Sequence, residues 1–189
     1  MVLSHVLSLS LLASVTALVF PGCVVDASDQ GEDDSDTETI ASVEEALSFS
    51  AIVIKNVNSG QALNIYDNST GDAAPVIQWP YSGQANSQFR IEDLGDGHHR
   101  IVPLSSGKCL DIMAGAPYPG VAVQQWTCLG GDNQRFQFEA AGMGTYRIKA
   151  KQSGLCLDVF ASGTASGNAI LQAPCDTAKA SQKFVLQVP

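Results

Sequence analysis

The sequence predicts an all-β domain built from three copies of one unit, and three observations lead to that prediction. The dipeptide Ser-Gly recurs at a fixed step of 47 residues, at 59–60, 106–107 and 153–154. Apolar residues recur at the same step, and two cysteine pairs of equal spacing superpose under it. A period of about 20 to 50 residues is typical of folds assembled from repeated units that cannot bury their apolar faces alone.

The apolar residues that recur in phase are candidates for a shared core. Four sets keep the step and a fifth nearly does: Ile54, Ile101 and Ile148; Leu63, Leu110 and Leu157; Ile65, Ile112 and Val159; Val76, Val123 and Ile170; Phe89, Phe136 and Phe184. Phe184 comes one residue late, which a single insertion in the last connection would explain, because loops tolerate insertions.

The local pattern within each unit predicts short strands. Runs such as AIVIKNV, ALNIY and VIQW are separated by Gly, Ser, Asn, Asp and Pro, without a long apolar pattern of helical period. Three units of about four strands each can hide their edges by closing into a threefold barrel. We therefore expect a β-trefoil over residues 49–189, with repeats at about 51–97, 98–144 and 145–189.

Length and charge narrow the function classes. The 189 residues allow one domain of ordinary size, and 45% of them are apolar, enough for a real core. The formal net charge is −9, but nine acidic residues precede residue 47, and the remaining chain balances ten acidic with ten basic residues. The folded part therefore shows no electrostatic footprint for nucleic acid.

The first 25 residues are interpreted as a secretory signal. They contain no formally charged side chain, and residues 6–20 form an apolar run that is shorter than a comfortable membrane span of about 20 residues. Gly22-Cys23 resembles a bacterial lipobox, which would place a lipid on Cys23 and attach the chain to a membrane. Ordinary cleavage, for example after Ala27, is the competing route, and an uncleaved anchor is a third. We expect a secreted or cell-surface protein.

Residues 26–48 are expected to form a disordered acidic linker. The segment is rich in Asp, Glu, Ser and Thr and has no aromatic residue before Phe49, so self-repulsion and low hydrophobicity oppose packing. Its acids do not reproduce the spacing of a calcium-binding loop. A solvated spacer is the better interpretation.

The cysteines test the repeat. Cys109 and Cys128 are 19 residues apart, as are Cys156 and Cys175, and the first unit lacks both partners together. We expect the disulfides Cys109–Cys128 and Cys156–Cys175, each worth about 3 kcal/mol, and an oxidising compartment. A zinc site lacks CxxC spacing, and His98-His99 would point to opposite faces of a strand. No metal and no cofactor are predicted.

The motifs SGKCLDI, VQQWTC and DNQRF, in that order, resemble one repeat of the ricin B-type lectin family. The resemblance covers residues 49–189, although the family's terminal Gln-x-Trp is written here with Phe at 136 and 184. The stretch VIQWPYSGQANSQFRIEDLGDG looks like the branch attached to secreted glycosidases. The resemblance implies shallow pockets, one per repeat, that bind galactose-type or xylan-type glycans.

The second repeat carries the complete set of sugar-contacting residue types. A sugar site needs an aromatic platform beside fixed polar groups. By match to the family, Asp111 is the carboxylate that accepts from two hydroxyls and Trp126 is the stacking ring. Gln124, Asn133 and Gln134 complete the predicted site, whereas neighbouring Gln125 points away and is assigned a structural role.

The other two repeats depart from the pattern. The first keeps Trp79 and Asn86 but has Asn64 in place of the carboxylate, so that Asn64, Trp79 and Asn86 form a weaker candidate site. Ile77 and Ser87 stand there in place of two glutamines. The third keeps Asp158 and Gln182, but Leu171, Ala173 and Ser181 replace the strand Gln, the aromatic and the Asn. We expect no sugar in the third repeat unless Phe160 supplies a platform.

Structural alternatives stand beside these assignments. Trp126 could cap the core, Asp111 could bond turn amides, and Asn133 and Gln134 could be buried struts. For the whole chain, a non-catalytic carbohydrate-binding module competes with a β-trefoil that binds proteins or inhibits proteases. An enzyme is disfavoured, because glycoside hydrolysis needs two carboxylates about 5 to 10 Å apart and threefold geometry should separate Asp111 from Asp158.

Overall fold

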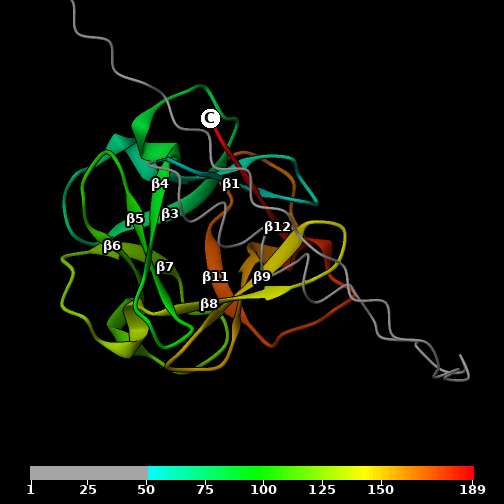
Figure 1. The fold of residues 1–189 in the computed structure, drawn as a ribbon. Helices are drawn as coiled ribbons and strands as arrows, with labels where there is room; N and C mark the ends of the chain where they lie inside the picture. The colour runs from blue at the N-terminus through cyan, green and yellow to red at the C-terminus, as the bar shows by residue number, and fades with distance from the viewer. Residues whose placement is uncertain (1–50) are drawn as a thin grey trace, which may run out of the picture. The chain divides into compact units, whose positions relative to one another are not determined.

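The computed structural model describes residues 51–189, and these residues form a β-trefoil (Figure 1). The signal segment, the acidic linker and Cys23, all predicted from the sequence, lie outside the described residues. Twelve strands make up the fold: β1 Val53–Asn56, β2 Ala62–Ile65, β3 Ala74–Trp79, β4 Phe89–Asp93, β5 His99–Pro103, β6 Cys109–Ile112, β7 Val123–Trp126, β8 Phe136–Ala140, β9 Thr145–Ala150, β10 Cys156–Val159, β11 Ile170–Ala173 and β12 Phe184–Gln187.

Six strands close into the barrel. The pairs β4–β5, β8–β9 and β12–β1 are antiparallel and lie side by side, and each joins one repeat to the next. Within each unit a short antiparallel pairing completes the ring: Ile52↔Phe89 in the first, His99↔Phe136 in the second, and Phe184↔Tyr146 with Val185↔Thr145 in the third. In Figure 1 the last strand, β12, lies beside the first, β1, which is where the ring closes. Closure leaves no exposed barrel edge.

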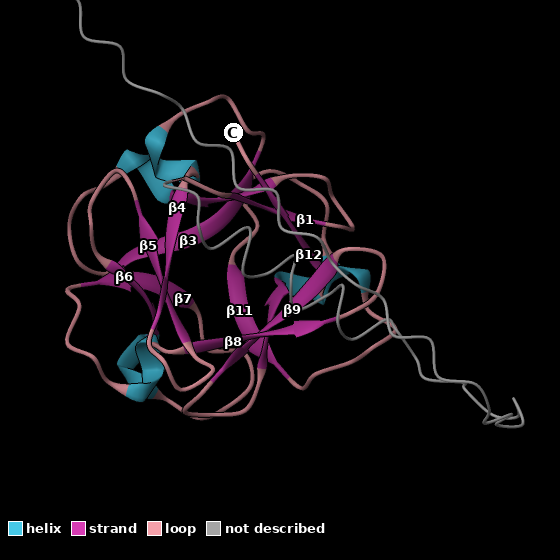
Figure 2. Ribbon diagram, viewed as in Figure 1, coloured by secondary structure: helices cyan, strands magenta, loops and turns pink. Residues whose placement is uncertain are grey.

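Three further hairpins, β2–β3, β6–β7 and β10–β11, repeat the same register once per unit. Six 3₁₀ turns connect the strands and lie at the periphery (Figure 2): η1 Tyr66–Asn68, η2 Ala85–Ser87, η3 Met113–Gly115, η4 Asp132–Gln134, η5 Phe160–Ser162 and η6 Ala180–Gln182. The central residue of η1, η3 and η5 has a left-handed backbone in each case, so the turn geometry also follows the threefold repeat.

The barrel interior contains the predicted in-phase residues. All fifteen members of the five apolar sets named above are buried in one hydrophobic core, each with at most 1% of its surface exposed. Phe89, Phe136 and Phe184 are the largest fully buried side chains. The late position of Phe184 does not disturb its place in this core. The predicted all-β, threefold architecture is confirmed.

Three buried glutamines join neighbouring repeats. Gln78, Gln125 and Gln172 occupy equivalent positions, and each accepts a hydrogen bond from a serine hydroxyl of its own repeat at 2.7 to 2.8 Å. Each then donates from Nε2 to two backbone carbonyls in a loop of a neighbouring repeat, at 2.7 to 3.0 Å. Because the loops have no strand partner for these carbonyls, the glutamines satisfy groups that burial would otherwise leave unpaired.

Both predicted disulfides are formed. Cys109–Cys128 and Cys156–Cys175 have Cα–Cα distances of 5.1 and 5.0 Å, and each ties the start of an inner hairpin to the loop that follows it. Cys109 lies at the first residue of β6, two positions before Asp111. The disulfide therefore fixes the strand that presents the principal site residue.

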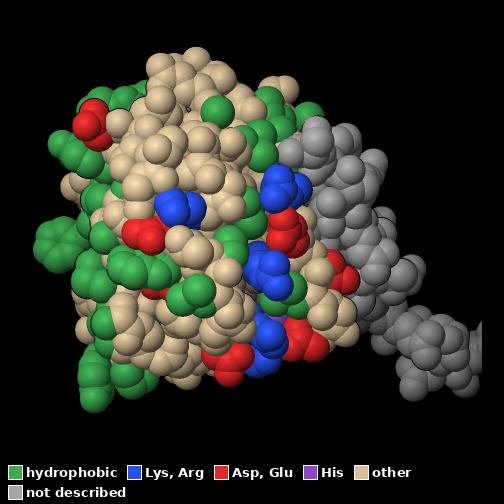
Figure 3. Space-filling view, turned by 90° about the vertical axis from the view of Figure 1, so that its left-hand side faces the viewer, with side chains coloured by type: hydrophobic (Ala, Val, Ile, Leu, Met, Phe, Trp, Pro, Cys, Tyr) green, Lys and Arg blue, Asp and Glu red, His purple; other side chains and the backbone are tan. Residues whose placement is uncertain are grey.

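Many charged side chains of the domain form ion pairs with one another. Figure 3 shows lysine and arginine side chains beside acidic ones on one face of the molecule. Ion pairs of the domain include Arg90–Glu92 at 2.7 Å and Lys151–Asp96 at 3.1 Å. Exposed pairs of this kind contribute about 0 to 1 kcal/mol each. Within residues 51–189, no helix is long and apolar enough to cross a membrane.

Candidate functional site

The site in the second repeat is built around the Asp111 carboxylate. Asp111 lies directly opposite Gln124 in the β6–β7 hairpin, and Gln124 Nε2 donates to Asp111 Oδ1 at 3.1 Å. Asn133 Nδ2 and Gln134 Nε2 both donate to Oδ2, at 2.6 and 3.0 Å. The structure thus brings together all four polar residues predicted from the sequence. We call these four residues the polar floor.

Gln134 is the anchor of the polar floor. Its Oε1 accepts hydrogen bonds from the backbone N–H groups of Leu129 and Gly130 at 2.8 and 3.2 Å, and its Nε2 also donates to the carbonyl of Thr127 at 2.9 Å. With these contacts and the bond to Asp111, every polar atom of this buried side chain is used. Gln134 therefore holds the carboxylate and the adjoining loop in fixed positions. The structural role considered for it as an alternative in the sequence analysis, a buried strut, is thus part of its contribution to the site.

Asp111 retains the capacity to bind a ligand. Only 3% of its surface is exposed, yet it lines the pocket. A carboxylate offers about four acceptor positions, and the three amide donors leave about one of them, on Oδ1, for a hydroxyl. Burial raises the pKa of the Asp111 carboxyl above its ordinary value of 3.8, against the three amide hydrogen bonds, which lower it, and the nearby charge of Asp72 raises it further.

Trp126 forms a wall of this pocket. Val123, three residues earlier on β7, is in the core, whereas Gln124 and Trp126 both line the pocket, as their shared strand face predicts. The pocket has a volume of about 660 Å³ and lies within the range of small-ligand sites. An aromatic ring beside hydrogen-bonding groups is the arrangement that can bind both the C–H face and the hydroxyls of a sugar.

The remaining lining residues were not identified from the sequence. Met113 and Ala114 come from η3, Leu129 and Gly131 from the loop after β7, and Ala73 from the first repeat. Gly131 has a packing role, because a Cβ there would lie 2.6 Å from Asn133 Oδ1. The 47-residue step could have pointed to position 113, since its counterpart is Phe160, which was considered for the third repeat.

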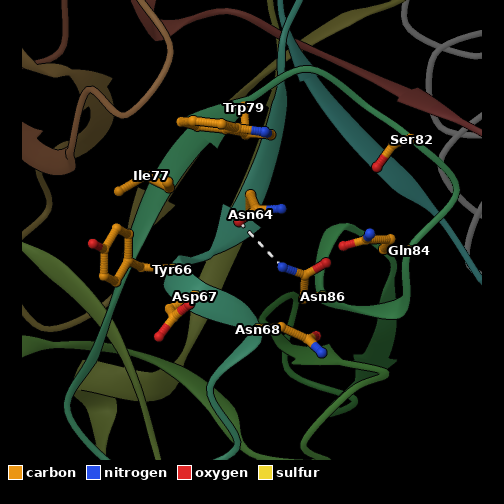
Figure 4. A pocket seen from close by; sticks show the side chains of 9 residues that line it. All are labelled: Asn64, Tyr66, Asp67, Asn68, Ile77, Trp79, Ser82, Gln84 and Asn86. Carbon is orange, nitrogen blue, oxygen red and sulfur yellow. Dashed lines mark hydrogen bonds between the residues drawn. The ribbon is translucent and has the colours of Figure 1, made fainter.

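A second pocket, of about 370 Å³, lies in the first repeat (Figure 4). It brings together the predicted Asn64, Trp79 and Asn86, and Asn86 Nδ2 donates to Asn64 Oδ1 at 3.3 Å. Tyr66 and Trp79 border it and are 55% and 47% exposed. Figure 4 shows further polar side chains around the opening that sequence reasoning had not assigned: Asp67, Asn68, Ser82 and Gln84.

The third repeat has the carboxylate, Asp158, but lacks the strand glutamine, the aromatic ring and the asparagine that surround Asp111 in the second repeat. Gln182 Nε2 donates to Asp158 Oδ2 at 2.9 Å, and Lys179 Nζ lies 3.8 Å from the same oxygen. Leu171 faces Asp158 across the hairpin where the second repeat has a glutamine. Asp158 Oδ1 is buried and makes no hydrogen bond within residues 51–189. Phe160 is exposed, and whether it supplies a platform stays a prediction.

Among the residues that the structure describes, no cluster of three or more His, Cys, Asp or Glu is arranged to hold a metal ion. His99 is buried, and its Nε2 lies 4.0 Å from Asp93. Burial lowers the pKa of His99 below its ordinary value of 6.5, and Asp93 opposes this shift.

The structure is a β-trefoil with a candidate ligand pocket in its second repeat. The family model described as "Ricin-type beta-trefoil lectin domain" matches residues 50–184, and the chain belongs to this family. Comparison with curated proteins returned no match.

Solved structures agree with this membership. A designed threefold-symmetric protein, ThreeFoil, is 36% identical with a TM-score of 0.72, over 74% of this chain and 99% of that one. The exo-β-1,3-galactanase 1,3Gal43A from Clostridium thermocellum is 31% identical with a TM-score of 0.71, over 74% of this chain but only 30% of the enzyme. A ricin B-like lectin from Macrolepiota procera, solved with lactose, shares the fold at 19% identity and a TM-score of 0.62, over 74% of this chain and 95% of that one.

Proposed function

We propose that this chain is a non-catalytic lectin module that binds galactose-type or xylan-type glycans mainly through the pocket of the second repeat. The observation that carries the proposal is the polar floor, in which Asp111 is fixed by three amide donors beside the Trp126 wall. A preorganised acceptor with one free position suits a sugar hydroxyl, and an aromatic wall suits the apolar face of a sugar ring.

The relatives support the choice of ligand class. The region similar to this chain covers 30% of a protein named as an exo-β-1,3-galactanase, so galactose-containing polymers are the first ligands to test. The enzymatic activity of that protein is not carried over, since the similarity covers a minor part of its length. Xylan-type glycans are retained as the second ligand class.

Binding by one shallow pocket is expected to be weak. A single site of this kind corresponds to a dissociation constant of roughly 1 mM, or about −4 kcal/mol. Useful retention would then depend on several copies of the module at one surface. An exported chain attached through a lipid on Cys23, with residues 26–48 as a spacer, would provide such a surface. The intact mass of the native protein tests that attachment, because a diacylglycerol-modified Cys23 adds a defined mass that plain cleavage does not.

A glycan array with matched tryptophan variants tests the binding function. Trp126→Ala should abolish retention on the glycans that the parent protein binds, whereas Trp79→Ala, in the first-repeat pocket, should leave most of it. Circular dichroism of both variants must match that of the parent. A protein that binds no glycan on the array, yet captures a protein partner tightly, would instead favour the interaction or inhibitor function.

A further inference from the structure

The mouth of the second-repeat pocket is apolar, although its floor is polar. Leu129 is 76% exposed and Met113 is 45% exposed, and both line the pocket together with Trp126. Single exposed apolar side chains are common on protein surfaces, but several gathered at one opening above hydrogen-bonding groups indicate a binding function. We call Met113, Ala114 and Leu129 the apolar rim.

The equivalent pocket of the first repeat has the opposite arrangement. At the 47-residue step, the apolar rim corresponds to Tyr66, Asp67 and Ser82, and Gly131 corresponds to Gln84. The opening of that pocket is therefore richer in polar groups, as Figure 4 shows.

The floors differ in the reverse sense. Asp111, Gln124 and Gln134 of the second repeat correspond to Asn64, Ile77 and Ser87. Because the same backbone accommodates both sets, the fold does not require an apolar rim at 113, 114 and 129. The side chains of the apolar rim can therefore serve ligand selection instead of folding.

Leu129 is held beside the polar floor by two constraints. Its backbone N–H donates to Gln134 Oε1 at 2.8 Å, and the preceding Cys128 is bonded to Cys109. The loop backbone is thus connected directly to the residue that anchors Asp111. The Leu129 side chain therefore lines the same pocket as the groups that would bind the hydroxyls of a ligand.

We propose that the second-repeat pocket selects saccharides that carry an apolar substituent next to the hydroxyls bound by the floor, with Leu129 and Met113 as the specificity-determining residues. This inference rests on the proposed lectin function and names its ligand class more closely. The apolar substituent can be an acyl group on the sugar ring or an apolar aglycone. Each buried methylene-sized group strengthens binding about fourfold, and a phenyl group by about tenfold or more.

Titration with paired glycosides tests the inference. Phenyl and methyl β-D-galactosides, and the same pair of xylosides, are titrated into the isotopically labelled chain and followed by NMR. Acetylated and alkali-deacetylated xylo-oligosaccharides form a second arm, which distinguishes an acyl group from an aglycone. The parent protein should prefer the acetylated member of a pair by about fourfold and the phenyl member by about tenfold or more.

Leu129→Ser is the matched variant, because serine is the residue at the equivalent position 82 of the first repeat. It should remove most of the preference, measured as the ratio of the dissociation constants of the two members of a pair, while its amide spectrum outside the pocket matches that of the parent. Ser82→Leu serves as a control for general stickiness and should create no preference. Equal binding of the paired ligands, or a preference that survives Leu129→Ser, would overturn the inference but leave the lectin function standing. Binding of neither member of any pair would overturn both.

Discussion

The adjacent residues Gln124 and Gln125 on β7 should separate binding from stability. Gln125 accepts from Ser106 Oγ at 2.8 Å and donates to the carbonyls of Ser69 and Gly71 at 2.9 and 2.7 Å, and it is fully buried. Gln124 faces the pocket and makes one side-chain bond, to Asp111. The alanine variants of the two residues therefore remove very different numbers of buried partners.

The expected magnitudes follow from those partners. Gln125→Ala leaves two carbonyls and one hydroxyl without their partner, and each buried unsatisfied group costs about 1 to 3 kcal/mol. Partial access of water to the loop reduces the sum, so we expect a loss of about 3 to 5 kcal/mol in the free energy of unfolding. Gln124→Ala loses one bond at a wet pocket and should cost about 1 kcal/mol, with weaker sugar binding.

Equilibrium urea denaturation, followed by tryptophan fluorescence, measures both variants. Gln78→Ala and Gln172→Ala are symmetry controls, because Gln78 and Gln172 make the equivalent three hydrogen bonds in the other repeats. Gln78→Ala, Gln125→Ala and Gln172→Ala should lower the free energy of unfolding by amounts that agree within about 1 kcal/mol. The reasoning is refuted if Gln125→Ala is no more destabilising than Gln124→Ala.

Further outcomes are expected from the disulfides and the two buried titratable groups. Replacing Cys109 and Cys128 by alanine should cost about 3 kcal/mol in urea denaturation, and an unchanged midpoint would contradict this. Protonation of the Asp111 carboxylate should weaken sugar binding, and because its pKa is raised, this loss should begin at a higher pH than the ordinary pKa of 3.8 implies. Measuring the affinity between pH 7 and pH 4 tests this, and Asp111→Asn should lose the pH dependence. Because burial lowers the pKa of His99 in the folded chain, acidification protonates His99 in the unfolded chain at a higher pH than in the folded chain. The free energy of unfolding should therefore fall as the pH drops below about 6.5. His99→Phe should flatten this slope, and a slope equal to that of the parent protein would rule out His99 as its source.

The fold could be predicted because its determinants repeat. The step of 47 residues places Ile54, Ile101 and Ile148 at equivalent positions, and the structure buries all three. The same step identifies the partner of each cysteine without any knowledge of the barrel. A prediction from a pattern that occurs three times in one chain depends far less on local secondary-structure propensities than a prediction from a single element.

The polar floor could also be predicted, since strand alternation places Gln124 on the face opposite Val123 and family motifs supply Asp111 and Gln134. The rim could not. Leu129 lies in a loop where no periodicity applies, and its position depends on a bond to Gln134 and on the disulfide beside it. Ala73 enters the second-repeat pocket from the first repeat.

The role of Gln125 was predicted only in part. Its strand face excluded it from the pocket, which indicated a structural role. Its acceptors at Ser69 and Gly71 belong to another repeat, more than 50 residues earlier in the chain, and only the folded structure brings them together. Long-range hydrogen bonds of this kind have no signature in the local sequence.

Chemical-shift mapping of a bound sugar is the most direct test of the second-repeat site. Lactose and xylobiose are titrated separately into the isotopically labelled chain, and backbone amides, side-chain amides and indole N–H groups are followed. We predict that the shifts concentrate on Gln124, Trp126, Asn133 and Gln134, with smaller changes at Trp79. Shifts confined to the first or third repeat, or no shifts at millimolar sugar, would contradict the assignment of this pocket.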